Sequence, residues 1–378
     1  MDYELLKIIW WALIGILLIG FAITDGFDMG VGAILPFVGK TDSERRVALN
    51  ALGPHWEGNQ VWFVTAAGAL FAAWPIVYAV AFSGFYWAMM LTLFAMFFRP
   101  VGFEYRSKVK DPRWRSAWDW GIFAGSAIPA LVFGVAFGNL FLGVPFEFDS
   151  MMRSTYHGGL FGLLNPFALL CGVVSLSLLI LHGANYLQMR TLGEVAVRAR
   201  RFSIGAGLVL LTSFTLAGVW LHFGIDGYLI HTMTDTGTAM QPTNKEVVLQ
   251  ADAWFVNYQR FPLLWLAPAL GLGTALLSIL FAVTRHAGWS FFCSALTCAG
   301  VIATAGGSLF PFVLPSSLNP NHSLTMWDAV SSEMTLGIML VVALIFVPLI
   351  LGYTLWCYRK LWGKVSVEHI ENNSVGSY

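Results

Sequence analysis

Long apolar runs recur along this chain from one end to the other, separated by shorter polar segments. Each run holds roughly 20 residues, and a helix of that length crosses the roughly 30 Å hydrocarbon core of a bilayer. Lipid offers the backbone no hydrogen-bond partners, so helices are the expected conformation. The pattern predicts nine transmembrane spans, at 8–31, 51–73, 76–98, 119–142, 160–182, 203–224, 262–283, 289–313 and 335–357.

The connecting segments are short, and none has the size of a separate soluble domain. The longest one, 225–261, is polar and mixed in charge. We therefore expect residues 1–378 to form a single membrane domain of the all-α class. Trp74 and Pro75 separate the second and third spans, which predicts a tight helical hairpin at that point.

The basic residues predict which side of the membrane each loop occupies. With nine spans, 17 of the 21 Lys and Arg residues fall after odd-numbered spans or in the C-terminal tail, and only Lys7, Arg153, Lys245 and Arg260 fall opposite. Basic residues favour cytoplasmic loops. The N-terminus and the 225–261 loop are therefore expected on the periplasmic side, and the C-terminus in the cytoplasm. An eight-span topology would mix the two groups.

Composition supports a membrane protein and excludes other classes. Hydrophobic residues make up 57% of the chain and charged residues 11%, whereas a soluble chain carries about 25% charge. The formal net charge of zero gives no electrostatic support to a nucleic-acid partner. The four cysteines form no C-x-x-C pair, which is more typical of small buried hydrophobes than of a disulfide or a metal site.

Ionisable residues inside the first two spans are candidate functional groups, because such groups are costly in a membrane and by default mark a pathway or a site. The first span carries Asp25 and Asp28, which share one helix face. The second carries His55 and Glu57, with Glu57 roughly 9 Å into the span. Because the two spans run in opposite directions, we expect three carboxyls and a histidine at similar depth in the cytoplasmic half.

Two interpretations of this cluster stay open. The carboxyls can form a relay that takes up protons from the cytoplasm, or they can cap and join helices with help from backbone donors near Gly26 and Gly30. Arg99 and Glu104, at the inner end of the third span, can stabilise or feed a relay. They can equally form an interfacial ion pair of little energetic value.

The histidines do not favour a haem or metal site built by this chain alone. Dihaem helix bundles usually place histidine pairs on facing helices, whereas each span here offers at most one of the eight histidines. His182 at the inner end of the fifth span and His222 at the outer end of the sixth are typical of capping or interfacial residues. We expect no metal ligands and no catalytic residue in this chain, although a neighbouring chain can place a cofactor against it.

Several motifs, in order along essentially the whole chain, together resemble subunit II of the cytochrome bd ubiquinol oxidases. They are Thr24–Gly30 (TDGFDMG), His55–Trp62 (HWEGNQVW), Phe97–Lys108 (FFRPVGFEYRSK), Gly183–Thr191 (GANYLQMRT) and Leu324–Ser331 (LTMWDAVS).

The resemblance implies a fold of two four-helix bundles plus a peripheral helix, in the bacterial cytoplasmic (inner) membrane. It implies a heterodimer with a related subunit I, often joined by one or more very small single-span subunits. Such a complex oxidises ubiquinol or menaquinol on the outer side and reduces dioxygen to water with cytoplasmic protons. Haem b and haem d are then held by subunit I. This chain would be the haem-poor subunit, not catalytic alone, which supports assembly of subunit I and proton supply.

The resemblance also assigns expected roles by position. Asp25, Asp28 and Glu57 become candidate proton-path residues, with His55 and Glu104 beside them. Many relatives have Asp where this chain has Glu57, so the carboxyl is kept but displaced by one methylene. Trp62 is a weaker candidate for a gas or quinone route. Whether this chain binds a structural quinone, as some members do, stays open.

Two other functions are weighed against the oxidase. A proton-coupled secondary transporter should show a polar site near the midplane and an inverted repeat, whereas the acidic cluster lies on one side and no repeat is evident. A self-sufficient dihaem electron carrier would need histidine pairs that the spans lack. The motifs favour the oxidase subunit over both.

Overall fold

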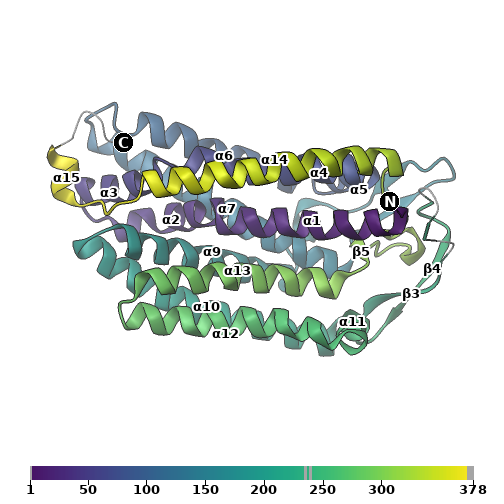
Figure 1. Cartoon of the computed structure of the whole chain (residues 1–378). Helices are drawn as coiled ribbons and strands as arrows, with labels where there is room; N and C mark the ends of the chain where they lie inside the picture. The colour runs from purple at the N-terminus through teal and green to yellow at the C-terminus, as the bar shows by residue number, and fades with distance from the viewer. Residues whose placement is uncertain (1, 234–235, 238–240, 373–378) are drawn as a thin grey trace.

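Long helices lie side by side along one axis (Figure 1). The computed structural model describes residues 2–233, 236–237 and 241–372. The long helices are α1 (Tyr3–Ile23), α2 (Asp25–Val38), α4 (Trp56–Ala73), α6 (Tyr86–Tyr105), α7 (Pro112–Leu142), α9 (Pro166–Arg190), α10 (Gly193–Gly224), α12 (Leu266–Val283), α13 (Ala287–Leu309) and α14 (Glu333–Lys360). Within the described residues eight helices, counting α1 and α2 as one, are long and apolar enough to cross a membrane. The number is nine if the bent pair formed by Trp56–Ala73 and Pro75–Gly84 counts as one span.

The helices form two groups of four with one helix outside them. The first group holds α1 with α2, α4, α6 and α7, and the second holds α9, α10, α12 and α13. Helix α14 lies along α1 and α4, and only 11% of its most apolar segment is buried inside the chain. The predicted all-α fold with two four-helix bundles and a peripheral helix is confirmed.

The predicted third span, 76–98, is wrong in its bounds. Helix α5 (Pro75–Gly84) follows α4 at a bend of 117°, and the chain breaks again at Phe85 before α6 begins. Proline lacks an N–H and disfavours helical backbone before it, which explains the break at Trp74. The break at Phe85 follows Ser83 and Gly84, but the stretch around it is apolar enough on average that hydropathy does not mark it.

The predicted fifth span, 160–182, is displaced by several residues. Helix α9 begins at Pro166, and the Asn165 side chain accepts a hydrogen bond from the Ala168 backbone N–H at 2.8 Å. An N-cap followed by proline at the first helical position is a favourable helix start. The helix therefore begins later and continues to Arg190, which moves His182 from the helix end to its interior.

Small strands and short helices lie at one end of the molecule, which we name the hairpin end. Three antiparallel pairs form there: β1 (Phe146–Phe148) with β2 (Ser154–Tyr156), β3 (Gly227–Met233) with β4 (Lys245–Gln250), and β5 (Phe312–Leu314) with β6 (Leu324–Thr325). The short helices beside them are α8 (Leu160–Leu163), η1 (Ala253–Phe255), α11 (Val256–Arg260), η2 (Pro262–Trp265) and η3 (Pro320–His322). A buried ion pair between Lys245 and Asp328, 2.6 Å long, fastens β4 to the segment before α14.

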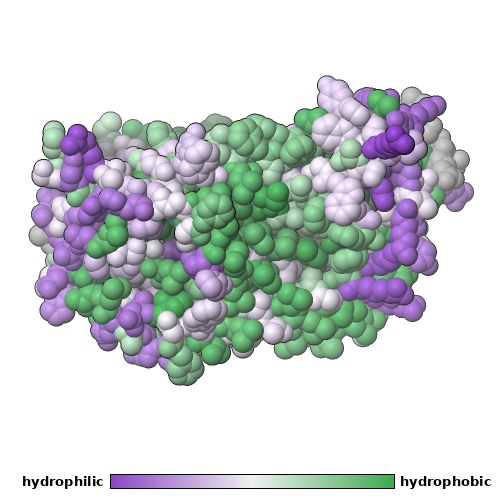
Figure 2. All heavy atoms as spheres, turned by 180° about the vertical axis from the view of Figure 1, so that it is seen from behind, coloured by the Kyte–Doolittle hydropathy of each residue, from purple (hydrophilic) through white to green (hydrophobic). Residues whose placement is uncertain are grey.

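The opposite end, which we name the α3 end, carries α3 (Asp42–Leu52) and α15 (Val367–Asn372). On the face that Figure 2 shows, an apolar belt lies between the two ends, and polar residues gather toward each end. This distribution fits a protein whose long helices cross a membrane.

The two groups of helices meet where α2 touches α9 through backbone atoms. A Cβ on Gly30 would lie 1.8 Å from the Leu179 carbonyl oxygen, and one on Gly183 would lie 2.5 Å from the Val31 nitrogen. Small residues allow such close helix approach in membranes. The contact fixes the start of α2, where both buried aspartates lie.

Candidate functional site

The site contains a buried ion pair between Asp25 and Arg99. Asp25 is the first residue of α2, and its carboxylate accepts two hydrogen bonds from Arg99 of α6: Nη2 to Oδ1 at 2.7 Å and Nη1 to Oδ2 at 3.1 Å. The side chains are 0% and 1% exposed. Two parallel bonds between a guanidinium and a carboxylate form a strong and directional contact. Asp25 is therefore held as a paired carboxylate.

Asp28, one turn further along α2, has a different environment. Its Oδ2 accepts a hydrogen bond from Asn59 Nδ2 of α4 at 2.7 Å. The Asn59 Oδ1 in turn accepts one from the Tyr358 hydroxyl of α14, also at 2.7 Å. The other carboxylate oxygen of Asp28 is buried and has no hydrogen-bond partner among the described residues. Buried polar atoms are almost always partnered, so this oxygen is the atom of the site that is suited to hold a proton.

His55 lies beside the hydrogen-bonded series Asp28–Asn59–Tyr358, where its ring stacks on Tyr358. Its ring lies against the ring of Tyr358, with centroids 4.2 Å apart and planes 16° apart, and the residue is 5% exposed. Tyr358 thus contacts two residues at the start of α4, His55 through its ring and Asn59 through its hydroxyl. It lies in the last span, and no motif in the sequence pointed to it.

The other two carboxyl candidates, Glu57 and Glu104, lie outside the buried cluster, because both residues are exposed. Glu57 precedes Asn59 by two residues, or about 200° around a helix, so it points away when Asn59 faces Asp28. Two carboxyls and a histidine therefore gather in the interior, and the third carboxyl lies on the outer face of α4.

Trp62 is part of a packed wall. It is 7% exposed and belongs to a cluster with Leu17, Phe21 and Met29. A Cβ on Gly20 would lie 2.6 Å from its ring, so the indole fills the space that this glycine leaves. Its role in a gas or quinone route stays a prediction.

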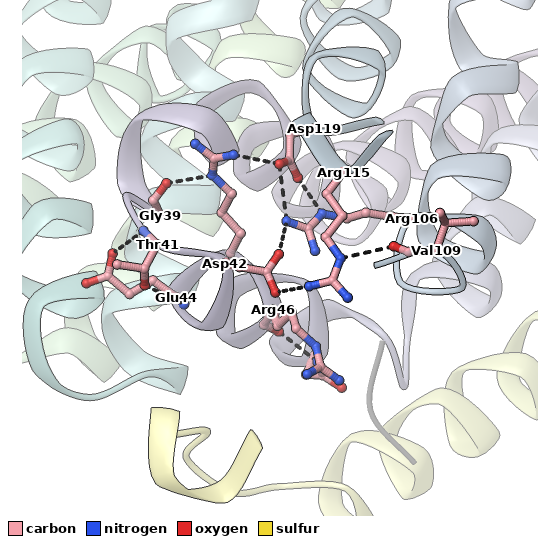
Figure 3. Close-up of polar contacts among 11 residues, drawn as sticks. Gly39, Thr41, Asp42, Glu44, Arg46, Arg106, Val109, Arg115 and Asp119 are labelled. Atoms are coloured by element: carbon pink, nitrogen blue, oxygen red, sulfur yellow. Dashed lines mark hydrogen bonds and ion pairs between the residues drawn. The ribbon is translucent and has the colours of Figure 1, made fainter. Parts of the chain in front are cut away.

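Helix α3 is fastened across the α3 end by a network of ion pairs (Figure 3). Asp119 of α7 accepts hydrogen bonds from Arg45 Nη1 at 2.7 Å and from Arg106 Nε at 2.5 Å. Asp42 accepts from Arg106 Nη2 at 3.0 Å and from Arg115 Nη1 at 2.5 Å. The network joins α3 to the adjacent ends of α6 and α7.

A second contact joins α3 to α10. Glu44 completes a capping box with Thr41 and pairs with Arg198. Arg198 holds the pKa of the Glu44 carboxyl below its usual value, with backbone donors at Thr41 and Lys40 assisting. On the buried face of α3, the Ala51 carbonyl accepts a hydrogen bond from the Tyr186 hydroxyl at 2.9 Å. Helix α3 is therefore a fixed part of this end.

The histidines of the described residues do not fit a haem site. The buried ones are His55, which stacks on Tyr358, and His182. His182 lies inside α9 and not at a helix end, and its ring nitrogens contact Ser294 Oγ at 2.8 Å and the Ile23 carbonyl at 2.9 Å. Both nitrogens are therefore engaged in holding helices together. No group of three or more His, Cys, Asp or Glu residues placed to bind a metal occurs within the ranges described.

Comparisons with known proteins agree on one family. The sequence model described as cytochrome bd terminal oxidase subunit II matches residues 6–361. Subunit 2 of the cytochrome bd-I ubiquinol oxidase of Escherichia coli K12 is 57% identical over 377 residues, which cover 100% of both chains. A probable cytochrome oxidase subunit 2 of Haemophilus influenzae is 55% identical, also over 100% of both chains. Subunit 2 of the Bacillus subtilis cytochrome bd ubiquinol oxidase is 32% identical, over 95% of this chain and 96% of that one.

A solved structure shares the fold. A chain from the bd oxidase of Geobacillus thermodenitrificans superposes with a TM-score of 0.66, covering 95% of this chain and 99% of the other. The sequence identity in that alignment is 14%, so the match supports the helix arrangement alone.

Proposed function

Because this chain belongs to the family of cytochrome bd terminal oxidase subunit II, we propose that it is the haem-poor subunit of a bacterial quinol oxidase, with two tasks. It supports the assembly of the haem-bearing subunit I, and it supplies cytoplasmic protons for the reduction of dioxygen to water. Family membership itself makes the chain an integral membrane subunit of a quinol:oxygen oxidoreductase with a subunit I partner.

The observation that supports proton supply is the hydrogen-bonded chain Asp28–Asn59–Tyr358. Reduction of dioxygen to water consumes one proton for each electron, and quinol oxidation releases protons where the quinol is bound. In this proposal Asp28 takes its protons from the cytoplasm, opposite the side on which quinol oxidation releases protons. Turnover then builds a proton gradient across the membrane. Residues of this kind in membrane spans commonly form proton relays.

The chain's residues divide the work in this proposal. Arg99 keeps Asp25 paired, whereas Asp28 contacts a neutral amide and can change its charge. Asn59 orients the Asp28 carboxyl, and Tyr358 holds the Asn59 amide in place. His55, stacked on Tyr358, lies on the side from which protons arrive.

Glu57 suggests where subunit I packs. On α4 the exposed residues Glu57, Val61, Val64, Gly68 and Phe71 repeat at spacings of three and four and form one stripe. An ionised side chain facing hydrocarbon is unfavourable by about 2.5–3.5 kcal/mol on insertion scales. We propose that subunit I covers this stripe and that Glu57 lies in the seam, where it can pass protons toward Asp28.

The proposed orientation places the α3 end in the cytoplasm. Arg46, Arg106 and Arg115 gather at that end (Figure 3), and Arg45 joins them through Asp119. Such residues favour the cytoplasmic side. The N-terminus and the 225–261 loop are then periplasmic, and the host membrane is the bacterial cytoplasmic (inner) membrane. Residues 1–378 form one membrane domain in this proposal.

The cofactors of the proposed complex are haem b and haem d, held by subunit I. The engaged nitrogens of His182 support this assignment. The substrate is ubiquinol or menaquinol, and one or more small single-span subunits complete the assembly.

An optical spectrum tests the oxidase assignment. Material purified gently from native membrane should show haem b and haem d bands, and this chain expressed alone should show neither. Haem retained by the isolated chain would overturn the assignment of the ligands to subunit I. Native material without haem would overturn the oxidase function.

Matched variants test the proton path in the assembled complex. Asp28→Asn and Glu57→Gln should slow turnover while the haem bands keep their intensity. Glu194→Gln is the control, because Glu194 is exposed in the first turn of α10 and outside the cluster. Normal turnover in a fully assembled Asp28→Asn complex would refute the path through this residue.

A further inference from the structure

A groove runs along the outer face of the second helix group, between α9 and α10. Residues 173–180 of α9 and 201–209 of α10 line a hollow of about 430 Å³. A second hollow of about 550 Å³ continues it toward the hairpin end, between residues 166–173 and 216–220. Val173 borders both hollows. The first hollow can recognise a charged group, because Arg201 is the one charged residue among the described residues that line it.

The first hollow has the length of one leaflet. From Arg201 to Val209 the helix rises eight residues, or about 12 Å at 1.5 Å per residue. Half of the roughly 30 Å hydrocarbon core is close to this length. A chain lying in the groove would therefore begin at the membrane boundary and end near the midplane.

Arg201 supplies a positive charge at the outer limit of this groove. It is exposed and forms no hydrogen bond or ion pair with any of the residues that the structure describes. Arg198, one turn earlier, contrasts with it, because Glu44 and the Val38 carbonyl occupy its guanidinium. The charge of Arg201 is thus available to an anion at the depth of the lipid headgroups.

Gly205 forms the floor of the hollow. Apart from the adjacent residues and the backbone of its own helix, no described atom lies within 4 Å of where its Cβ would stand, so no close helix contact explains a glycine there. Gly207 differs, since its Cβ would meet Ile279 at 2.6 Å. A glycine inside a helix is unfavourable by about 0.5–1 kcal/mol relative to alanine. What Gly205 provides is the open space of the groove itself.

We propose that this groove binds one anionic phospholipid of the leaflet at the α3 end, with an acyl chain over Gly205 and the phosphate on Arg201. The second hollow has no charged lining residue, so the lipid is anchored from the Arg201 end. A guanidinium recognises phosphate through charge and paired donors. A quinone has no anionic group to place there. The proposal does not depend on the proton path.

Native mass spectrometry of the gently purified complex tests the site. The complex is exchanged into phosphatidylglycerol, which is anionic, or into phosphatidylcholine, which is zwitterionic, and the tightly retained lipids are counted. Gly205→Leu fills the groove and should remove one retained phosphatidylglycerol. Gly218→Leu is the control, because Gly218 is exposed on the same helix, has nothing within 4 Å of its Cβ and lines neither hollow.

The charge is tested separately. Arg201→Gln should weaken retention of phosphatidylglycerol about fivefold, the effect of one basic residue at an anionic surface, and abolish the preference over phosphatidylcholine. Arg285→Gln, which removes an exposed arginine outside the groove, should leave both unchanged. An unchanged lipid count in Gly205→Leu would overturn the site. Loss of a quinone instead of a phospholipid from that variant would overturn the choice of ligand.

Discussion

Removing the hydroxyl of Tyr358 is the sharpest test of the hydrogen-bonded chain at Asp28. In Tyr358→Phe the ring keeps its stack on His55, with centroids 4.2 Å apart, while the 2.7 Å bond to Asn59 Oδ1 is lost. The change therefore separates the hydroxyl from the packing of α14. Asn59 is 1% exposed, so its carbonyl oxygen is left buried and unpaired.

The size of the effect follows from that unpaired oxygen. A buried polar group that loses its partner is destabilised by about 1–3 kcal/mol, and the stability of the complex should fall by this amount. Asn59 is then free to turn away from Asp28. If about 1 kcal/mol of this energy bears on the step in which Asp28 gains or loses a proton, turnover falls about fivefold, because 1.4 kcal/mol corresponds to tenfold.

The assay is oxygen consumption with saturating quinol in the assembled oxidase, with the haem bands used to normalise the amount of complex. Tyr353→Phe is the matched control, because Tyr353 lies on the same helix and is 64% exposed. A double-mutant cycle with Asn59→Leu should show strong non-additivity if the bond acts as a unit. Unchanged turnover in Tyr358→Phe, or an equal loss in Tyr353→Phe, would refute the reasoning.

Three further outcomes are expected. Arg99→Met leaves the buried Asp25 carboxylate unpaired and should destabilise the complex by about 3–5 kcal/mol; adding Asp25→Asn should recover most of the loss in thermal unfolding, and no recovery would argue against the ion pair. Gly30→Ala places a Cβ 1.8 Å from the Leu179 carbonyl oxygen and should destabilise the complex by about 1–3 kcal/mol, whereas Gly15→Ala, with nothing within 4 Å, should not lower the unfolding temperature. Because Arg198 lowers the pKa of Glu44, the stabilisation from this pair is complete above the ordinary pKa of 4.5 and is lost as pH falls through the lowered pKa. Hydrogen exchange of α3 should therefore speed up in acid in the wild type and respond less to pH in Glu44→Gln. Identical pH responses in the two proteins would contradict this prediction.

The number of spans could be predicted because lipid makes hydrophobicity a strong signal, whereas their grouping into two bundles was implied by the family resemblance. The breaks within the spans were harder to predict. Thr24 separates α1 from α2 inside one predicted span, and Phe85, two residues after Ser83, separates α5 from α6 inside another. Helix α3 lies before the predicted second span, although its capping box from Thr41 to Glu44 is a recognisable helix start.

The candidate site was predicted in part. Helix periodicity alone shows that Glu57 and Asn59 cannot face the same neighbour, so the outward position of Glu57 was accessible from the sequence. The contact from Tyr358 was not, because 299 residues separate it from Asn59. Packing of the peripheral helix creates that contact, and no local pattern records it.

The two aspartates of α2 differ in their hydrogen-bond partners, and this difference favours Asp28 as the proton carrier of the proposed path. The Asp25 carboxylate accepts two hydrogen bonds from the buried guanidinium of Arg99, and losing this pair would leave Arg99 as an unpaired buried cation. Asp28 has an amide donor on one oxygen and, within the part of the chain that the structure describes, no partner on the other. Protonating it leaves a neutral amide as its partner and no unpaired buried cation. We therefore infer that Asp25 with Arg99 provides a fixed pair and that Asp28 is the group whose charge changes during turnover.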